Sequence, residues 1–260
     1  ENIIKVLTFY NSNNSIKNEI LETDNLLKKS KYNLTDINKI ENKDIIEFYN
    51  KSNLITLNKL NNLKYNFTQI WRRNTIDLNC SRHFDVFRNF NVIPKFCFEC
   101  FKVQIELQTV LDLIKLYFVF NNIEFGENKS RKCLVEMRSK GFGTYKGLIY
   151  CTGYNDAKKI YEKISKVLKV SLKNKFSIKI RRGCTEFGDA YPEYKNLSKP
   201  VNEFMKYKEE WKEKEDIIDK KLPTKNRINQ RILNNTLKGI SLNDFLIIRN
   251  WIMYAKKIND

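Results

Sequence analysis

The chain has a single histidine, and it lies three residues after a cysteine. Cys80-Ser-Arg-His83 is followed, after thirteen further residues, by Cys97-Phe-Glu-Cys100. A gap of two residues lets both members of a pair reach one tetrahedral ion, and thiolates and imidazoles are ligands that zinc prefers. These two pairs therefore predict a metal site.

The other three cysteines allow more than one interpretation. Cys184 follows two arginines and a glycine, so it is either a further metal ligand or a reactive thiol at a strand end. Cys133 and Cys151 alternate with expected core residues, where free cysteine is commonly buried, and this simple interpretation stays open for the paired cysteines too. Disulfides are not expected, because nothing marks the chain as exported. The predicted ligand set is Cys80, His83, Cys97, Cys100 and Cys184, with zinc as the metal.

Residues 95–187 alternate between strand and helix patterns. Period-two alternation of apolar and polar residues predicts strands, and apolar residues at helical spacing predict helices. The resulting order is βαββαβ, the arrangement of ferredoxin-like folds. Right-handed crossovers favour an antiparallel sheet in spatial order 4-1-3-2, with both helices on one face. The predicted strands cover residues 96–106, 132–138, 145–152 and 176–182, and the predicted helices cover residues 109–122 and 155–172.

This topology gathers cysteines that are far apart in the sequence. The first strand opens with Cys97 and Cys100, at the edge where the third and fourth strands end. Cys151 ends the third strand and Cys184 follows the fourth, while Cys133 opens the second strand at the same edge. We therefore expect five cysteines near one edge of the fold, in support of the metal site.

Helical extensions are predicted on both sides of this core. The N-terminal part is polar and rich in asparagine, with helical spacing of its apolar residues. The C-terminal part is predicted to hold a charged helix over residues 201–221, and Ser241-Leu-Asn-Asp244 is typical of a capping box that opens a last helix packing on the core. The expected division of this α+β chain is an extension over residues 1–75, a core over 76–190 and an extension over 191–260.

The helix-free face of the predicted sheet is expected to carry charged side chains. Arginine and lysine bind phosphate and carboxylate groups, and a carboxylate beside them can perform acid–base chemistry. A covered face with cross-strand ion pairs is the simple alternative. The predicted anion-binding residues are Lys102, Arg138, Lys179, Arg181 and Arg182, with Arg72 and Arg73 at the rim. The candidate catalytic residues are Glu136, Arg138, Arg181 and Cys184.

The overall charge is strongly positive, at +18, from 48 Lys and Arg residues against 30 Asp and Glu residues. Such a balance favours a polyanionic partner such as nucleic acid. Lysine and asparagine, whose codons are A/T-rich, are both abundant, so part of the charge is expected to lie on solvated helix faces.

Several functions are excluded by missing motifs. The chain has no Walker loop, no G-x-G-x-x-G and no G-x-S-x-G elbow, and one histidine is too few for a metalloprotease helix. The longest apolar run, residues 110–120, is too short to cross a bilayer and contains two charges, so no membrane partner is expected. No signal peptide is visible, which predicts a cytoplasmic protein. The chain opens on Glu1 rather than methionine, which leaves room for a leader or an upstream domain.

These observations lead to three hypotheses. The leading one is a non-catalytic, intracellular binding module for nucleic acid or another polyanion, stabilised by zinc. The second is an enzyme that acts on a small substrate with a phosphate or carboxylate group at the helix-free face. The third is an adaptor whose terminal helices bind a partner protein, with that face covered.

Overall fold

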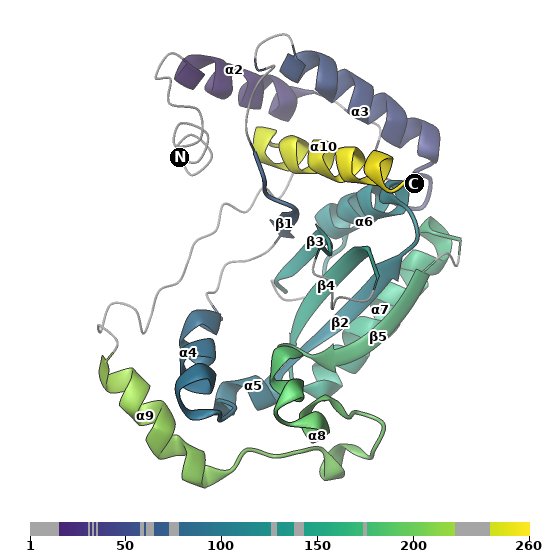
Figure 1. The fold of residues 1–260 in the computed structure, drawn as a ribbon. Coiled ribbons are helices and arrows are strands. Elements are labelled where there is room, and N and C mark those ends of the chain that lie inside the picture. The colour runs from purple at the N-terminus through teal and green to yellow at the C-terminus, as the bar shows by residue number, and fades with distance from the viewer. Residues whose placement is uncertain are drawn as a thin grey trace.

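A computed structural model of the chain shows a mixed α+β protein with one open, antiparallel sheet of five strands (Figure 1). The structure describes residues 16–30, 36–57, 65–72, 78–125, 129–137, 143–173, 176–221 and 240–260, and the single residues 32, 34 and 60. The strand order is β1-β3-β4-β2-β5. The strands are β1 (Gln69–Arg72), β2 (Cys100–Leu107), β3 (Arg131–Val135), β4 (Tyr145–Thr152) and β5 (Phe176–Arg182).

The sheet differs from the predicted one at an edge and at a strand start. Strand β1 was not predicted, because four residues in a polar segment give too short an alternation to recognise. It pairs with β3, so the sheet as a whole is not the four-stranded sheet in order 4-1-3-2 that the sequence predicted. Strand β2 starts later than predicted, because residues before it form the short helix α5 (Lys95–Glu99).

Two helices, α6 (Val110–Asn122) and α7 (Tyr154–Ser171), pack on the sheet. The side chains of Val103 and Ile105 on β2 are fully buried in this core, where free energy is gained by removing apolar surface from water. A Cβ atom at Gly147 of β4 would overlap with the side chain of Leu116 on α6. A glycine is therefore what allows α6 to approach the sheet this closely.

A second helical layer covers α6 on its far side. It consists of α2 (Ile16–Lys29), α3 (Asn42–Leu57) and α10 (Leu242–Lys257), which lie together above the sheet in Figure 1. The capping box predicted at the start of α10 is confirmed, since the Ser241 hydroxyl accepts from the Asp244 amide and the Asp244 carboxylate accepts from the Ser241 amide. No helix in the described ranges is both long and apolar enough to cross a membrane.

A smaller cluster of helices surrounds the end of the sheet where β2 begins. It contains α4 (Cys80–Phe90), α5, α8 (Pro192–Lys195) and α9 (Lys212–Lys221), and Arg82 of α4 pairs with Asp219 of α9 at 2.7 Å. The predicted helix over residues 201–221 is wrong for its first half, where only two short 3-10 turns form. Phe204 is buried in the main core and Trp211 in the smaller cluster.

Candidate functional site

The face of the sheet opposite α6 and α7 is polar. Strand register places Lys102 of β2 between Tyr150 of β4 and Arg181 of β5. The same alternation continues along all five strands, because successive side chains point to opposite faces. Within the described strands and at the residue that follows β3, this helix-free face carries five cations and two carboxylates, namely Lys102, Lys132, Lys146, Lys179 and Arg181 against Glu106 and Glu136.

Both carboxylates on the helix-free face are paired with lysines. The distance from Lys146 Nζ to Glu136 Oε2 is 3.2 Å, and both side chains are buried. Lys179 Nζ lies 2.7 Å from Glu106 Oε1. Burial raises the pKa of Glu106, but hydrogen bonds from Lys179 and Gln104 outweigh it and leave this pKa below its ordinary value. The face therefore keeps a net positive charge.

Lys102 is buried at one end of the helix-free face, with 8% of its surface exposed. Its ammonium group donates to the carbonyl oxygen of Gly183 at 2.9 Å. Burial lowers the pKa of Lys102, and the nearby Glu186 carboxylate opposes this shift. The more accessible cations lie toward the two edges of the sheet, and they are Lys132, Lys179 and Arg181.

Two aromatic rings lie on the same face. Trp71 of β1 and Tyr150 of β4 are stacked, with 5.7 Å between centroids and 14° between planes. Lys132 Nζ lies 4.5 Å from the centroid of the Trp71 ring, within the range of a cation–π contact. Aromatic side chains beside cations on a sheet can stack bases of single-stranded nucleic acid.

Several predicted anion-binding residues are not on this face. Arg72 and Arg182 each follow a residue that points to the helix-free side, so their own side chains point to the helix-covered side. Each is only 3% exposed. Arg73 and Arg138 lie outside the described residues. These corrections follow from register, which the sequence alone does not give.

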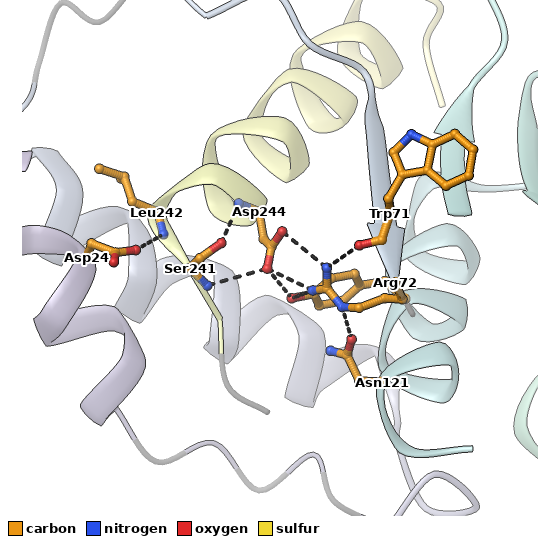
Figure 2. Close-up of polar contacts among 8 residues, drawn as sticks. Asp24, Trp71, Arg72, Asn121, Ser241, Leu242 and Asp244 are labelled. Carbon is orange, nitrogen blue, oxygen red and sulfur yellow. Dashed lines mark hydrogen bonds and ion pairs between the residues drawn. The ribbon is translucent and has the colours of Figure 1, made fainter. Parts of the chain in front are cut away.

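Arg72 is the centre of a buried network that joins β1 to α6 and α10 (Figure 2). Its guanidinium pairs with the carboxylate of Asp244 at 2.7 Å and donates to the Tyr117 hydroxyl at 2.8 Å. It also donates to Asn121 and to the carbonyl oxygen of Trp71. Burial opposes the charge on Arg72, but Asp244 outweighs burial and raises the pKa of Arg72. This arginine has a structural role.

Four cysteines from different elements meet at the end of the sheet where β2 begins, and we call them the thiol cluster. Cys80 opens α4, Cys97 lies in α5, Cys100 opens β2 and Cys184 follows β5. Cys184 shares hydrogen bonds with Cys80 and with Cys97. Cys100 is close enough to Cys80 and Cys184 for their charges to interact.

A glycine accounts for part of this convergence. The amide of Gly183 donates to the carbonyl oxygen of Cys100 at 2.8 Å. A Cβ atom at Gly183 would overlap with the Cys100 sulfur, so a larger residue would push the end of β5 away. The residue that follows is Cys184, which is thereby held beside the start of β2.

Cys133 and Cys151 are not members of the thiol cluster. Both side chains point to the helix-covered side of the sheet and are buried in the main core, at 2% and 4% exposure. Their placement fits the interpretation as core cysteines. Burial raises the pKa of Cys151 to about 12, so its thiol is protonated at neutral pH.

His83 makes its contacts elsewhere. Its ring is stacked on Phe96, with 5.1 Å between centroids and 18° between planes, and Nδ1 lies 3.4 Å from Nη1 of Arg82. Burial and the neighbouring Arg82 charge lower the pKa of His83 to about 4. His83 is therefore neutral at physiological pH, and the ring contacts seen in the described part of the chain are with Phe96 and Arg82 rather than with the cysteines.

The thiols themselves do not form a ready coordination sphere. Within the described residues, no three or more His, Cys, Asp or Glu side chains are arranged to hold a metal ion. Burial raises the pKa of Cys100 to about 11. The hydrogen bond with Cys80 lowers the pKa of Cys184, while the bond with Cys97 and burial raise it, to about 12 in total. Near neutral pH the thiols of Cys100 and Cys184 are therefore protonated, and a protonated thiol is a weak nucleophile.

The candidate catalytic residues are not brought together. Glu136 lies beside the Tyr145 end of β4, whereas Arg181 is level with Tyr150. Five residues along a strand correspond to about 17 Å. Cys184 has the raised pKa described above, and the remaining candidate, Arg138, lies outside the described residues. No shared acid–base centre results from the residues that can be placed.

A pocket of about 590 Å³ lies on the side of the sheet that α7 covers. Its walls come from α5, from the junction between β4 and α7, from the end of β5 and from residues 201–207. Arg182 was predicted as an anion-binding residue and does line this pocket, although on the other side of the sheet. The other lining residues were not predicted from the sequence. Gly153, between β4 and α7, was the sequence feature that could have indicated them. The lining side chains include Phe101, Tyr154, Arg182, Phe204 and Lys206.

Comparison of the chain with protein-family models, with curated proteins and with solved structures gave no match. The assignment of a function therefore depends on the geometry of the helix-free face, the thiol cluster and the pocket.

Proposed function

We propose that the protein is a binding module for nucleic acid or another polyanion, which it contacts through the helix-free face of its sheet. The observation that carries this proposal is the excess of cations on that face, five against two carboxylates in the described strands and at the residue that follows β3. Both carboxylates are already neutralised by lysines of the same face. Lysine and arginine side chains neutralise phosphates and release counterions, which supplies most of the affinity in sequence-independent binding.

The accessible groups suit an extended single strand. Lys132 and Trp71 lie at the β1–β3 edge, and Lys179 and Arg181 lie at the β5 edge. The two edge strands are separated by four inter-strand spacings, about 19 Å. A polymer crossing the strands would meet cations at both edges and an aromatic ring at one of them, where a base could stack.

We further propose that β2, β3, β4 and β5 with α6 and α7 form a ferredoxin-like core, extended by β1, and that zinc at the thiol cluster stabilises one end of it. Four thiolates are a ligand set of closed structural zinc sites. Zinc would replace the thiol protons and draw the sulfurs into a tetrahedron, and would thereby link α4, α5 and the end of β5. The motivation is the convergence of the four cysteines from separate elements.

Polyanion binding can be tested by fluorescence anisotropy with a labelled single-stranded RNA and a labelled single-stranded DNA, over a range of salt concentrations. We expect the double variant Lys132→Glu/Arg181→Glu to weaken binding and to lower the slope of log K against log salt by about 2, or 1 for each lost phosphate contact. The matched control is Lys158→Glu/Lys159→Glu, an equal change of charge on the exposed side of α7. Absence of binding at low salt, or equal losses in both variants, would contradict the proposal.

The metal can be tested by elemental analysis of the purified protein. We expect one zinc per chain, lost in Cys97→Ser and kept in Cys133→Ala, which changes a cysteine outside the cluster. Well-folded wild-type protein without metal would remove zinc from the proposal and leave the helix-free face to be judged by the binding experiment.

A further inference from the structure

Strand β5 forms one margin of the sheet, and its outer side has no neighbouring strand among the described residues (Figure 1). On its inner side, β5 is paired with β2 along its whole length. An open strand edge presents a row of backbone donors and acceptors to any extended chain that comes beside it. A further strand could therefore be added to the sheet at β5.

A hydrogen bond beside the thiol cluster shows which residues of β5 direct their backbone outward. The Gly183 amide donates to the carbonyl oxygen of Cys100 at 2.8 Å. In an antiparallel pair every second residue bonds to the partner strand, and the residues between them turn their backbone groups away. Ile178 and Ile180 belong to this second set. No residue in the described part of the chain is hydrogen-bonded to their outward amide and carbonyl groups.

A groove of about 420 Å³ lies between β5 and α7, beside the same edge. The apolar part of its lining comes from Tyr161 of α7 and from Phe176 and Ile178 of β5, which are only partly buried. On the neighbouring β2, by contrast, Val103 and Ile105 are fully buried. An added strand would place every second side chain over the apolar lining of the groove and remove it from water.

The charged residues of the groove favour an acidic partner. Lys166 and Lys169 of α7 line it with one carboxylate, that of Glu162. All three side chains are exposed, so their charges are available to a bound chain. Complementary charges raise the rate of association and select among partners.

Strand β5 also carries two cations on the helix-free side of the sheet. These are Lys179, which is paired with Glu106, and Arg181. If two copies of the chain joined through β5, these cations would lie beside those of the other copy, and like charges across strands are destabilising. Charges of this kind commonly protect sheet edges from self-association. A second copy is therefore a poor occupant, whereas an acidic strand would be attracted.

From these observations we infer that the β5 edge binds an extended acidic segment of a partner protein, which adds to the sheet as a further strand. In antiparallel pairing, the arrangement of the strand pairs described above, opposite residues share a face of the sheet. Residues of the segment opposite Ile178 and Ile180 would bond to β5 and direct apolar side chains toward the groove. The residues between them would direct acidic side chains toward Lys179 and Arg181. The recognised pattern is an alternation of apolar and acidic residues.

The test is fluorescence anisotropy of the full chain with a labelled peptide of alternating valine and glutamate, about as long as β5. We expect this peptide to bind at least about tenfold more tightly than one of alternating valine and lysine. Methylation of the valine nitrogens removes the donors that face Ile178 and Ile180, and should weaken binding at least about tenfold. Methylation of the glutamate nitrogens, which face away from β5, should change the affinity by less than about threefold.

A matched pair of variants tests the groove. Lys169→Glu reverses a charge that lines it and should weaken the valine–glutamate peptide about fivefold. Lys159→Glu makes the same change at an exposed lysine of α7 that does not line the groove, and it should leave the affinity unchanged. Far-UV circular dichroism confirms that both variants fold.

A third variant separates this inference from the proposed function. Lys132→Glu changes the opposite edge of the sheet, so it should weaken binding of nucleic acid and leave peptide binding unchanged. The inference is overturned if the valine–lysine peptide binds equally well, if methylated valines do not weaken binding, or if Lys169→Glu and Lys159→Glu behave alike. It is also overturned if Lys132→Glu loses peptide binding, or if the free chain is a dimer that the peptide dissociates.

Discussion

Two buried arginines on the helix-covered side of one sheet have different partners. Arg72 at the β1 edge pairs with the carboxylate of Asp244 and also donates to the side chains of Asn121 and Tyr117 (Figure 2). Arg182 at the β5 edge donates only to backbone carbonyls, and its guanidinium lies 4.6 Å from the centroid of the Phe101 ring. Both side chains are 3% exposed, so burial does not explain the difference.

The comparison separates a buried charge that is paired with a carboxylate from one that is satisfied by backbone carbonyls. A buried charge is costly unless it is paired or hydrogen-bonded, and Arg72 satisfies this requirement within the protein. Arg182 is hydrogen-bonded but not neutralised by a carboxylate among the described residues.

The largest effect is expected from Asp244→Asn. This change leaves the buried Arg72 without its counterion, and loss of one partner of a buried pair costs about 3–5 kcal/mol of unfolding free energy. Urea denaturation measures it. The control Asp85→Asn removes an exposed pair with Arg88 and should cost less than about 1 kcal/mol. Equal losses in the two variants would mean that Asp244 does not neutralise Arg72.

His83 provides a second test, because this buried side chain is uncharged at neutral pH. Its pKa is lowered to about 4 in the folded protein, below the unfolded value of 6.5. The stability that follows is fully present above pH 6.5 and is lost as the pH falls from 6.5 toward 4, by about 2–3 kcal/mol. Urea denaturation at several pH values should show this loss in the wild type and not in His83→Phe, which retains the stack on Phe96. Parallel curves would contradict the prediction.

A smaller effect is expected from Arg182→Met. The variant leaves backbone carbonyls without donors but leaves no charge unpaired, so we expect a loss of about 1–3 kcal/mol, less than for Asp244→Asn. The adjacent Arg181→Met, on the helix-free face, should change the unfolding free energy by no more than about 0.5 kcal/mol. A loss in Arg182→Met as large as in Asp244→Asn would show that the two buried arginines are equivalent.

The smallest effect is expected from Tyr117→Phe. This change removes one hydroxyl that links Arg72 to Asp244 and should cost about 1 kcal/mol. Combined with Asp244→Asn, its effect should be non-additive, because both residues belong to one network. Denaturation of the two single variants and the double variant gives the coupling energy, and a strictly additive result would place Tyr117 outside the network.

The parts of the fold with strong periodicity were predictable from sequence. Apolar and polar residues alternate along β2, and this pattern correctly predicts that Val103 and Ile105 are buried in the core. The capping box at Ser241 is likewise a local sequence pattern that is found in the structure. The mixed α+β class followed from them. Strand β1 has only four residues, so its signal was too short, and its pairing with β3 depends on residues about sixty positions away.

The sites were predictable only in part, for a different reason. Chain order was sufficient to suggest that Cys97, Cys100 and Cys184 approach one another, because strand ends meet at a common edge. Which face a cation occupies depends on register, and a shift of one residue separates Arg181 from Arg182. The pocket was not foreseen, because one wall is the irregular segment 201–207, which has no periodic pattern.

The network around Arg72 also constrains the order in which parts of the chain can fold during synthesis. Asp244 is 172 residues further along the chain than Arg72, so during synthesis the arginine emerges from the ribosome long before its carboxylate exists. Until α10 is made, burying β1 would enclose an uncompensated charge, and the nascent sheet should leave this edge unformed. Strand β1 would then join the sheet only after α10 has been synthesised and Asp244 can pair with Arg72.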